Sequence, residues 1–297
     1  MQTLERLFTQ WSDAIWGPPM IILLLGTHLF LTFRLRFIQK YIGKAIKMSF
    51  SREREGEGDM SQFGAMTTAL AATIGTGNIV GVATAVAAGG AGAFNGHAAA
   101  GGFLGAGVRE TMRYGIARGL FSNESGLGSA PILAAAAQTK NPVRQALVSS
   151  TGTFWDTVVV CAMTGLVLVN SGEWMNGAHG AALTKAAFAD IPVFGPILLT
   201  FGLLTFVFST LLGWSYYGEK ASEYLFGTRA VRSYRYIWVL CVMLGSVVPI
   251  RMVWSFADIT NAAMAIPNLV SLLALSGVIV AETRKYLWDG DIDGPTG

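Results

Sequence analysis

The stretch that decides the fold is "TALAATIGTGNIVGVATAVAAGG" (residues 68–90). It is long enough to cross a bilayer, yet glycine and small polar residues fill its middle, where a lipid-facing helix carries leucine and valine. A second stretch, "GLFSNESGLGSAPILAAAA" (residues 119–137), has the same character. Unpaired backbone at membrane depth is tolerated only where it lines a site or a cavity. Two such interrupted segments in one chain are typical of a binding site in a secondary transporter.

The composition is that of an integral membrane protein. Of the 297 residues, 52% are hydrophobic and 13% are charged, and the mean hydropathy is +0.49. The two cysteines, Cys161 and Cys241, lie in separate apolar runs, so we expect neither a disulfide nor a metal site. The histidines are scattered, and no nucleophile has a base at a suitable spacing, so the chain is not expected to be an enzyme. No nucleic-acid partner is expected.

Apolar segments predict an all-α membrane protein with about seven transmembrane helices. The expected spans are residues 18–33, 65–88, 120–137, 146–170, 193–216, 236–250 and 252–281. The first span lacks a small-residue cleavage site and is followed by basic residues, which indicates a retained helix rather than a removed signal peptide. We therefore expect one transmembrane domain over residues 1–297.

The distribution of Lys and Arg predicts the orientation of the chain. Residues 34–54 carry seven basic side chains, so the loop after the first span should be cytoplasmic. Alternating sides from there places fifteen of the 21 Lys and Arg residues inside. Seven crossings with the N-terminus outside therefore satisfy the positive-inside rule.

The first interruption, "TIGTGN" (residues 73–78), combines hydroxyls, an amide and two glycines. If the helix unwinds here, freed carbonyls can coordinate a cation, and the N–H groups of the next half-helix can face an anion. Such a site suits a zwitterion that travels with a cation. The alternative is that Gly75, Gly77 and Gly81 form a small-residue surface for helix packing. Asn78 favours the binding site, because packing does not require an amide.

The second interruption contains an ionisable residue, Glu124, within the apolar run. Such residues are costly in a membrane and mark function by default. Three roles remain open for Glu124: binding a cation, exchanging a proton, or pairing with Arg118 to stabilise the broken helix. Gly126, Gly128 and Pro131 also predict non-helical backbone here.

Later apolar segments carry further polar residues. We interpret Asp156 as a hydrogen-bonded carboxylate near the cytoplasmic side. Thr210 and Trp214, spaced i and i+4, share one helical stripe that either closes a pocket or ends in an interfacial aromatic residue. Asp258, Asn261 and Asn268 could supply another polar stripe. The alternative for Asn268, which follows Pro267, is a partner for backbone groups that the proline frees.

These segments resemble the alanine or glycine:cation symporter family, also called sodium:alanine symporters. The matching runs include "TALAATIGTGNIVGVATAVAAGGAGAF", "RYGIARGLFSNESGLGSAPILAAAAQTKNPVRQ", "GTFWDTVVVCAMT", "FSTLLGWSYYGEK" and "WSFADITNAAMAIPNLVSLLALSGV". The resemblance implies two inverted five-helix repeats with two broken helices, preceded here by one extra helix. It also implies symport of alanine or glycine with sodium across the cell inner (cytoplasmic) membrane.

The resemblance also implies the residues of a site. The family's substrate pocket falls on Thr76, Gly77, Asn78, Phe121, Thr210 and Trp214. By analogy with the fold, the sodium site falls on Ala71, Ile74, Ser209 and Thr210. Sodium would act as the coupling ion, not as a catalytic cofactor.

The chain departs from the family pattern near residues 94–97. After "GGAGAF" the family continues through the four remaining helices of the first repeat, about 100 to 150 residues at the usual span length. An apparent internal deletion removes most first-repeat helices, which leaves the five-plus-five fold incomplete. Alternating access depends on one repeat moving against the other. Three hypotheses therefore stay open: symport, a non-transporting membrane remnant or partner subunit, and a pore-like sodium leak.

Overall fold

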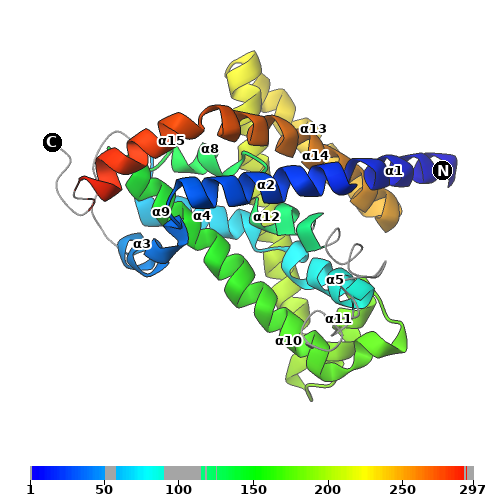
Figure 1. Ribbon diagram of the computed structural model, residues 1–297. Coiled ribbons are helices and arrows are strands. Elements are labelled where there is room, and N and C mark those ends of the chain that lie inside the picture. The colour runs from blue at the N-terminus through cyan, green and yellow to red at the C-terminus, as the bar shows by residue number, and fades with distance from the viewer. Residues whose placement is uncertain are drawn as a thin grey trace. The chain divides into compact units, whose positions relative to one another are not determined.

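The computed structural model describes residues 2–50, 58–89, 115–117, 119–124, 126–290 and 292 (Figure 1). Within these residues the regular structure is helical, apart from one isolated bridge between Met60 and Ala137. The first elements are α1 (Gln2–Ile15), α2 (Pro18–Arg34), η1 (Ile38–Tyr41), α3 (Ile42–Ser49), α4 (Gln62–Thr73), η2 (Gly77–Gly81), α5 (Val82–Gly89), α8 (Ala130–Ala134) and α9 (Pro142–Thr153). The others are η4 (Phe154–Cys161), α10 (Ala162–Ser171), η5 (Glu173–Asn176), α11 (Gly180–Ala189), α12 (Phe194–Phe226), α13 (Ala230–Val247), α14 (Ile250–Ala274), α15 (Ser276–Thr283) and η6 (Arg284–Trp288).

The chain packs as two compact units, each described by itself below. Unit 1 is built from Met1–Ala69, Ser125–Gly152 and Gly213–Gly297, and unit 2 from Leu70–Glu124 and Thr153–Leu212. The predicted deletion near residues 94–97 lies outside the described residues. The single-domain prediction over residues 1–297 remains a prediction.

In unit 1, the N-terminal helix α1 packs against α14 (Figure 1). The sequence did not predict α1, because Glu5, Arg6 and Asp13 lower its hydropathy. Trp16, only 1% exposed, fixes the end of α1 by donating from Nε1 to the carbonyl oxygen of Asp258 at 2.9 Å. The chain then bends by 43° into α2. Proline fits the first turn of α2 because N–H groups there have no acceptor within the helix, so the N–H that proline lacks costs no hydrogen bond.

Asn268 has a different role from the one expected. Its Nδ2 donates to the carbonyl oxygen of Gly126 at 2.9 Å, so it holds the turn of the second interruption rather than backbone near Pro267. The turn contains Gly126 and Gly128 with φ of 99° and 81°. A Cβ on Gly128 would lie 3.1 Å from Asn268 Oδ1. Glycine is therefore favoured there by both the left-handed backbone and the close approach of Asn268. This confirms the predicted non-helical backbone at the two glycines, whereas Pro131 lies in the first turn of α8.

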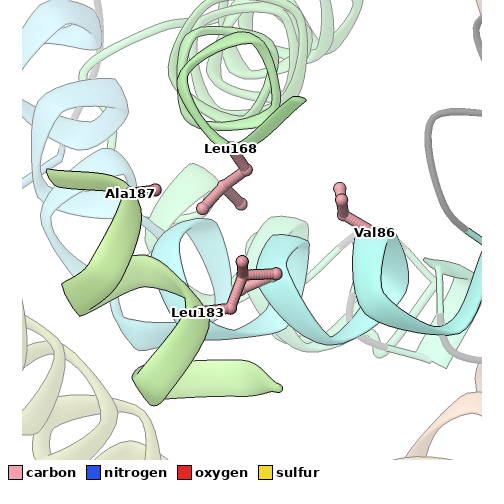
Figure 2. Close-up of a cluster of buried hydrophobic side chains, with 5 residues drawn as sticks. Val86, Leu168, Leu183 and Ala187 are labelled. Atoms are coloured by element: carbon pink, nitrogen blue, oxygen red, sulfur yellow. The ribbon is translucent and has the colours of Figure 1, made fainter. Parts of the chain in front are cut away.

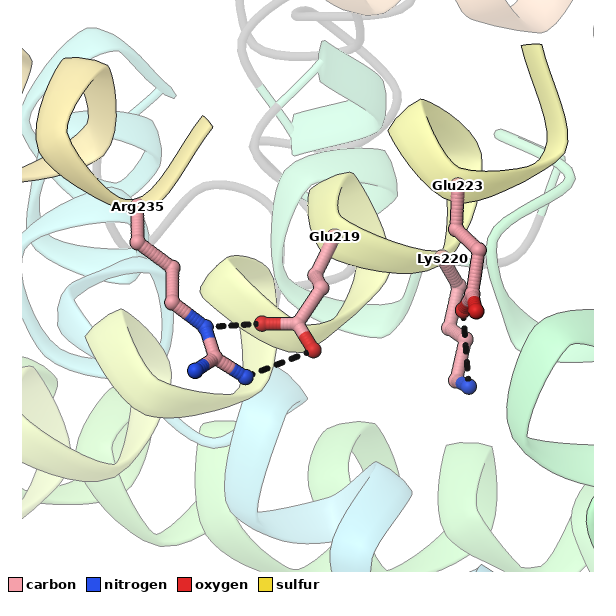
Figure 3. A network of polar contacts seen from close by, with 4 residues as sticks. All are labelled: Glu219, Lys220, Glu223 and Arg235. Atoms are coloured by element: carbon pink, nitrogen blue, oxygen red, sulfur yellow. Dashed lines mark hydrogen bonds and ion pairs between the residues drawn. The ribbon is translucent and has the colours of Figure 1, made fainter. Parts of the chain in front are cut away.

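Also in unit 1, the end of α12 is tied to α13 by a charged pair (Figure 3). Arg235 donates from Nε to Glu219 Oε2 at 2.8 Å and from a terminal nitrogen to Glu219 Oε1 at 2.9 Å. Lys220 and Glu223 form a second pair within α12 at 3.1 Å. The Arg235 side chain is 65% exposed. In water the two hydrogen bonds therefore orient the Arg235 and Glu219 side chains more than they stabilise the fold.

In unit 2, an apolar cluster joins α5, α10 and α11 (Figure 2). It consists of Ala83, Val86, Leu168, Leu183 and Ala187, all with at most 6% of their surface exposed. Helix α11 was not predicted, since ten alanine-rich residues are too few for a span. Its stability comes from packing this face, because isolated helices of that length are marginal in water. The cluster fixes α5, the second half of the first interrupted segment.

Several helices are long and apolar enough to cross a membrane. Within the described residues these are residues 142–171, Phe194–Phe226 and Ile250–Ala274, and two bent pairs would add two more. The bent pairs are Thr3–Ile15 with Pro18–Arg34 and Gln62–Thr73 with Gly77–Ala88. The structure thus supports a multi-pass all-α membrane protein, whereas seven crossings and an outside N-terminus stay predictions. The last expected span, residues 252–281, is divided at Leu275 into α14 and α15.

Candidate functional site

The first interruption is a true break in the helix. Helix α4 ends at Thr73, a bend follows, and the chain resumes at Gly77 with a change of direction of 56°. The new half-helix begins with the π-helical turn η2 and continues as α5. Thr76 precedes η2, and its hydroxyl makes no capping hydrogen bond. Short π-helical segments are frequent at functional sites.

The break redirects two backbone N–H groups and thereby frees two carbonyls. In a continuous α-helix, Gly75 N would donate to Ala71 and Asn78 N to Ile74. Instead, Gly75 N donates to Asn78 Oδ1 at 2.8 Å, and Asn78 N donates to the carbonyl of Gly75 at 3.2 Å. Ala71 and Ile74 therefore lose their helical donors. Both residues belong to the sodium site that the family resemblance implies, which stays a prediction.

Helix α12 supplies the Thr210 hydroxyl next to the carbonyl of Ile74, within unit 2. Thr210 Oγ1 donates to the carbonyl of Ile74 at 3.4 Å, a long hydrogen bond. A Cβ on Gly75 would lie 2.5 Å from Thr210 Oγ1, so only glycine lets the two segments approach this closely. Ser209, the neighbouring hydroxyl, donates to Phe206 in its own helix at 3.1 Å. The structure thus brings Ile74 and Thr210 together, and the Ser209 hydroxyl is bound to its own helix.

A buried polar network joins three segments of unit 2 at the break. Asn78 Nδ2 donates to Asp156 Oδ1 at 2.7 Å. Ser122 Oγ lies 3.0 Å from Asn78 Oδ1 and 3.0 Å from Asp156 Oδ2. Asn78, Ser122 and Asp156 are all at most 2% exposed. Because buried polar groups are stable only when paired, the network ties η2, the second interrupted segment and the π-helical segment η4 to one another.

The network uses the whole side-chain amide of Asn78. Its Oδ1 accepts from Gly75 N and lies beside the Ser122 hydroxyl, and its Nδ2 also reaches Cys161 Sγ at 3.3 Å. An amide offers two donors and two lone pairs. Both the nitrogen and the oxygen of this amide are therefore engaged, and the single Ser122 proton goes either to Asn78 Oδ1 or to the Asp156 carboxylate. In this conformation Asn78 therefore positions the break rather than offering free polar atoms.

The sequence interpretation missed the position of Asp156. It is hydrogen-bonded as expected, with Thr157 at 3.5 Å, but its short contacts go to Asn78 and Ser122 on distant segments. The available signal was a single acid within an apolar run. Asp156 belongs to the site because its carboxylate fixes Asn78, which in turn holds the break open.

The Asp156→Ala variant is expected to lose stability, because Asn78 Nδ2 and the Ser122 hydroxyl lose their shared acceptor. The loss should be about 1 to 3 kcal/mol for each buried group left unpaired. The Asp156→Asn variant keeps one acceptor oxygen and should lose less. Thermal unfolding of the purified protein measures both, with exposed Asp190→Ala as the control. Equal melting temperatures for Asp156→Ala and Asp190→Ala would contradict this role.

The structure brings part of the expected substrate pocket together. A Cβ on Gly77 would lie 3.4 Å from the Phe121 ring and 3.0 Å from Ser122 Cβ, so the two interruptions touch at these residues. Thr76 and Asn78 flank Gly77 at the start of the half-helix. Trp214 lies one turn beyond Thr210 on α12 but belongs to unit 1, where its ring packs edge-on against Tyr217 at 5.8 Å. Its expected role in the pocket stays a prediction.

The second interruption begins at Glu124. This residue is 1% exposed and has a φ of 54°, a conformation that side chains other than glycine rarely adopt. Its N–H still donates to the carbonyl of Leu120 at 3.0 Å, which ends the preceding helical turn. The expected partner, Arg118, lies outside the described residues. Strain of this kind is typical of functional sites.

The chemistry of the first break suits a hard monovalent cation. Among the described residues no group of three or more His, Cys, Asp or Glu side chains is placed to hold a metal ion. The groups that meet at the break are the carbonyl oxygen of Ile74 and the hydroxyl of Thr210. In discontinuous helices, unwound carbonyls coordinate sodium ions and half-helix N-termini face anionic substrate groups. The arrangement defines a candidate site of the secondary-transporter class.

Comparison with known proteins identifies the family. The profile of the sodium:alanine symporter family matches residues 1–94 and 91–292. The chain belongs to the sodium:alanine symporter family and is therefore a multi-pass membrane transporter rather than an enzyme.

Individual relatives agree with this assignment. An "uncharacterized transporter" of Haemophilus influenzae is 35% identical over an alignment of 439 positions that covers 96% of each chain. The sodium/alanine symporter AgcS of Methanococcus maripaludis is 35% identical, with 93% of this chain and 95% of that protein covered. The probable sodium/glutamine symporter GlnT of Bacillus subtilis is 36% identical over 65% of this chain and 40% of its own length. Symport of amino acids with sodium is thus the activity that the family implies.

Proposed function

We propose that this chain binds a small neutral amino acid, alanine or glycine, together with sodium at the first helix break, and carries both across the cell membrane. The observation that carries the proposal is the diversion of Gly75 N and Asn78 N away from Ala71 and Ile74. The carbonyls that lose their helical donors belong to two of the residues assigned to sodium by analogy with the family's fold. Family membership supports the same class of activity.

Sodium would lie between the break and α12. The carbonyls of Ala71 and Ile74 and the hydroxyls of Ser209 and Thr210 are hard oxygen ligands, which suit an alkali cation. The 3.4 Å contact from Thr210 Oγ1 to Ile74 is long enough for the hydroxyl to exchange its carbonyl partner for the ion. When a cation is bound, the Thr210 oxygen would turn a lone pair toward it. The Ser209 hydroxyl would have to leave Phe206 to join.

The amino acid would lie at the start of η2. Its carboxylate suits the N–H groups that follow Thr76, because a helix N-terminus leaves its first N–H groups free and carries partial positive charge. Gly77 has no side chain to block the approach, and Phe121 contacts it from the second interruption. The Phe121 ring gives this position an aromatic wall. Among the site residues that the structure describes, Asp156 and Glu124 carry the charged groups. Both features favour a substrate with a small uncharged side chain. Glycine and alanine both meet this condition.

The shortened first repeat bears directly on transport. The family profile matches in two parts that meet near residues 91–94, and the alignment with the Haemophilus influenzae relative is 439 positions long against 297 residues here. Both facts support an internal deletion near residues 94–97. The contacts of the first break come from segments on both sides of that point, so the sodium ligands do not require the missing stretch. The alternative of a non-transporting remnant or partner subunit is not favoured by the comparisons.

Uptake of radiolabelled alanine into proteoliposomes tests the proposal. We expect saturable uptake under an inward sodium gradient and none when potassium replaces sodium. Excess unlabelled glycine should inhibit uptake, whereas glutamine should not. Sodium entry that is independent of alanine would instead identify a leak, and binding without uptake would identify a non-transporting protein. Either of these results would overturn the proposed symport.

A further inference from the structure

A basic segment follows the membrane helix α2. Its members are Arg34, Arg36, Lys40, Lys44 and Lys47, and no acidic residue lies between positions 34 and 50. Helix α2 forms part of a candidate membrane span that ends at Arg34. The basic segment therefore begins at the end of this candidate span.

Helix α3 presents two different faces. Ala45, Met48 and Ser49 are at most 5% exposed and face the protein. Lys44 and Lys47 are spaced i and i+3, and Lys40 precedes Lys44 by one turn, so the three ammonium groups lie along another face. Lys40 and Lys47 are exposed and Lys44 is half-buried. The helix is thus oriented by its packed face, with a row of positive charges directed away from it.

Exposed phenylalanines accompany these charges. Phe33, Phe37 and Phe50 are 66%, 54% and 62% exposed, and the Phe33 and Phe37 rings pack edge to face at 5.3 Å. Arg36 and Phe37 both have positive φ, 54° and 58°, so the backbone turns sharply between α2 and η1. Bulky residues rarely adopt this conformation. The turn places aromatic and basic residues side by side at the end of the span, a composition typical of a membrane interface.

Several of the basic side chains also make contacts within unit 1, among them Lys40, whose ammonium group lies 5.1 Å from the centre of the Tyr41 ring. The Arg36 guanidinium lies 4.3 Å from the centre of the Trp288 ring, and Arg34 donates to Ser276 Oγ at 2.9 Å. These contacts anchor the basic segment to α15 and η6. Of the three lysines, Lys40 and Lys47 are exposed and Lys44 is half-buried, so their charge adjoins these contacts.

We propose that Lys40, Lys44 and Lys47 bind the headgroups of anionic phospholipids, with Phe33 and Phe37 inserted at the acyl boundary. The charge complementarity is direct, because three ammonium groups in a row match lipid phosphates that carry net negative charge. An acidic protein partner would not account for the exposed phenylalanines at the end of a membrane span. Free phosphate would leave them in water. A lipid satisfies both features at once.

Native mass spectrometry of the purified full-length chain tests this surface. Phosphatidylglycerol and phosphatidylcholine with identical acyl chains are added at equal concentrations. We expect wild-type protein to prefer phosphatidylglycerol. The triple variant Lys40→Gln, Lys44→Gln, Lys47→Gln should bind phosphatidylglycerol at least about tenfold more weakly than wild type, since each basic residue near an anionic surface adds to affinity. Binding of phosphatidylcholine should not change.

Three controls separate this proposal from its alternatives. The triple variant Lys140→Gln, Arg229→Gln, Arg232→Gln removes the same charge from other exposed positions and should bind as wild type does. Replacing the three lysines by arginine should keep lipid binding. An excess of inorganic phosphate should not displace the lipid. The proposal would be overturned by equal binding of both lipids or by displacement of the lipid by phosphate. It would also be overturned if the Lys40, Lys44 and Lys47 variant bound as wild type does, or if the Lys140, Arg229 and Arg232 variant lost as much binding.

Discussion

The Asn78→Ala variant is expected to lose sodium-dependent alanine binding. The substitution removes the acceptor of Gly75 N, the partner of the Ser122 hydroxyl and the donor to Asp156. Each buried group left unpaired is worth about 1 to 3 kcal/mol, and about 1.4 kcal/mol corresponds to a tenfold change in affinity. Without the bond to Asn78, Gly75 N can return to the Ala71 carbonyl, which closes the break. We expect affinity for alanine to fall by about a hundredfold or more, measured by equilibrium binding of the radiolabelled amino acid.

The matched control is Asn170→Ala, which removes an exposed asparagine near the end of α10. This variant should bind alanine as wild type does. Size-exclusion chromatography and circular dichroism establish that both variants are monodisperse and helical. A folded Asn78→Ala variant with wild-type affinity would show that the break does not depend on this side chain.

The Thr210→Val variant is expected to lower sodium affinity without unfolding the protein. Valine has nearly the same shape as threonine but lacks the hydroxyl that faces Ile74. If Thr210 Oγ1 is a sodium ligand, its loss should raise the sodium concentration for half-maximal alanine binding by about tenfold, which is about 1.4 kcal/mol. Alanine binding at saturating sodium should be restored. A titration of sodium chloride at constant ionic strength measures both quantities.

Thr205→Val is the control for this effect. Thr205 lies on the same helix, and its hydroxyl donates to Phe201 in α12 at 2.9 Å, away from the break. It should leave the sodium dependence unchanged. Equal shifts for the two variants would mean that the hydroxyl content of α12, rather than the Thr210 site, determines the response.

The sequence predicted the two interruptions because their causes are local. Glycine and small polar residues within an apolar run disfavour a continuous lipid-facing helix, and helical structure is indeed broken at residues 74–75, at residue 124 and at residues 126–129. The i and i+4 spacing of Thr210 and Trp214 also follows from α12 alone. The structure places the Thr210 hydroxyl beside the carbonyl of Ile74, and the sodium assignment carried over from the family stays a prediction.

The parts that were missed depend on tertiary contacts. Nothing near Asp156 in the sequence indicates that Asn78 and Ser122 will be its partners, because they are 78 and 34 positions away. Helix α11 is too short to be stable alone and forms by packing Leu183 and Ala187 on α5 and α10. Asn268 was assigned to the nearest proline, yet its amide bonds Gly126 at a separation of 142 residues. Spacing along the chain predicts local geometry, whereas these pairings are set by the fold.

The most direct test of the central claim is equilibrium binding of radiolabelled alanine to the purified, detergent-solubilised chain in sodium and in potassium. The claim is that the first helix break and α12 form a sodium-dependent amino-acid site in this chain. We expect saturable binding in sodium, none in potassium, and loss of binding in Asn78→Ala. No binding in sodium by a monodisperse helical protein, or equal binding in both salts, would contradict it.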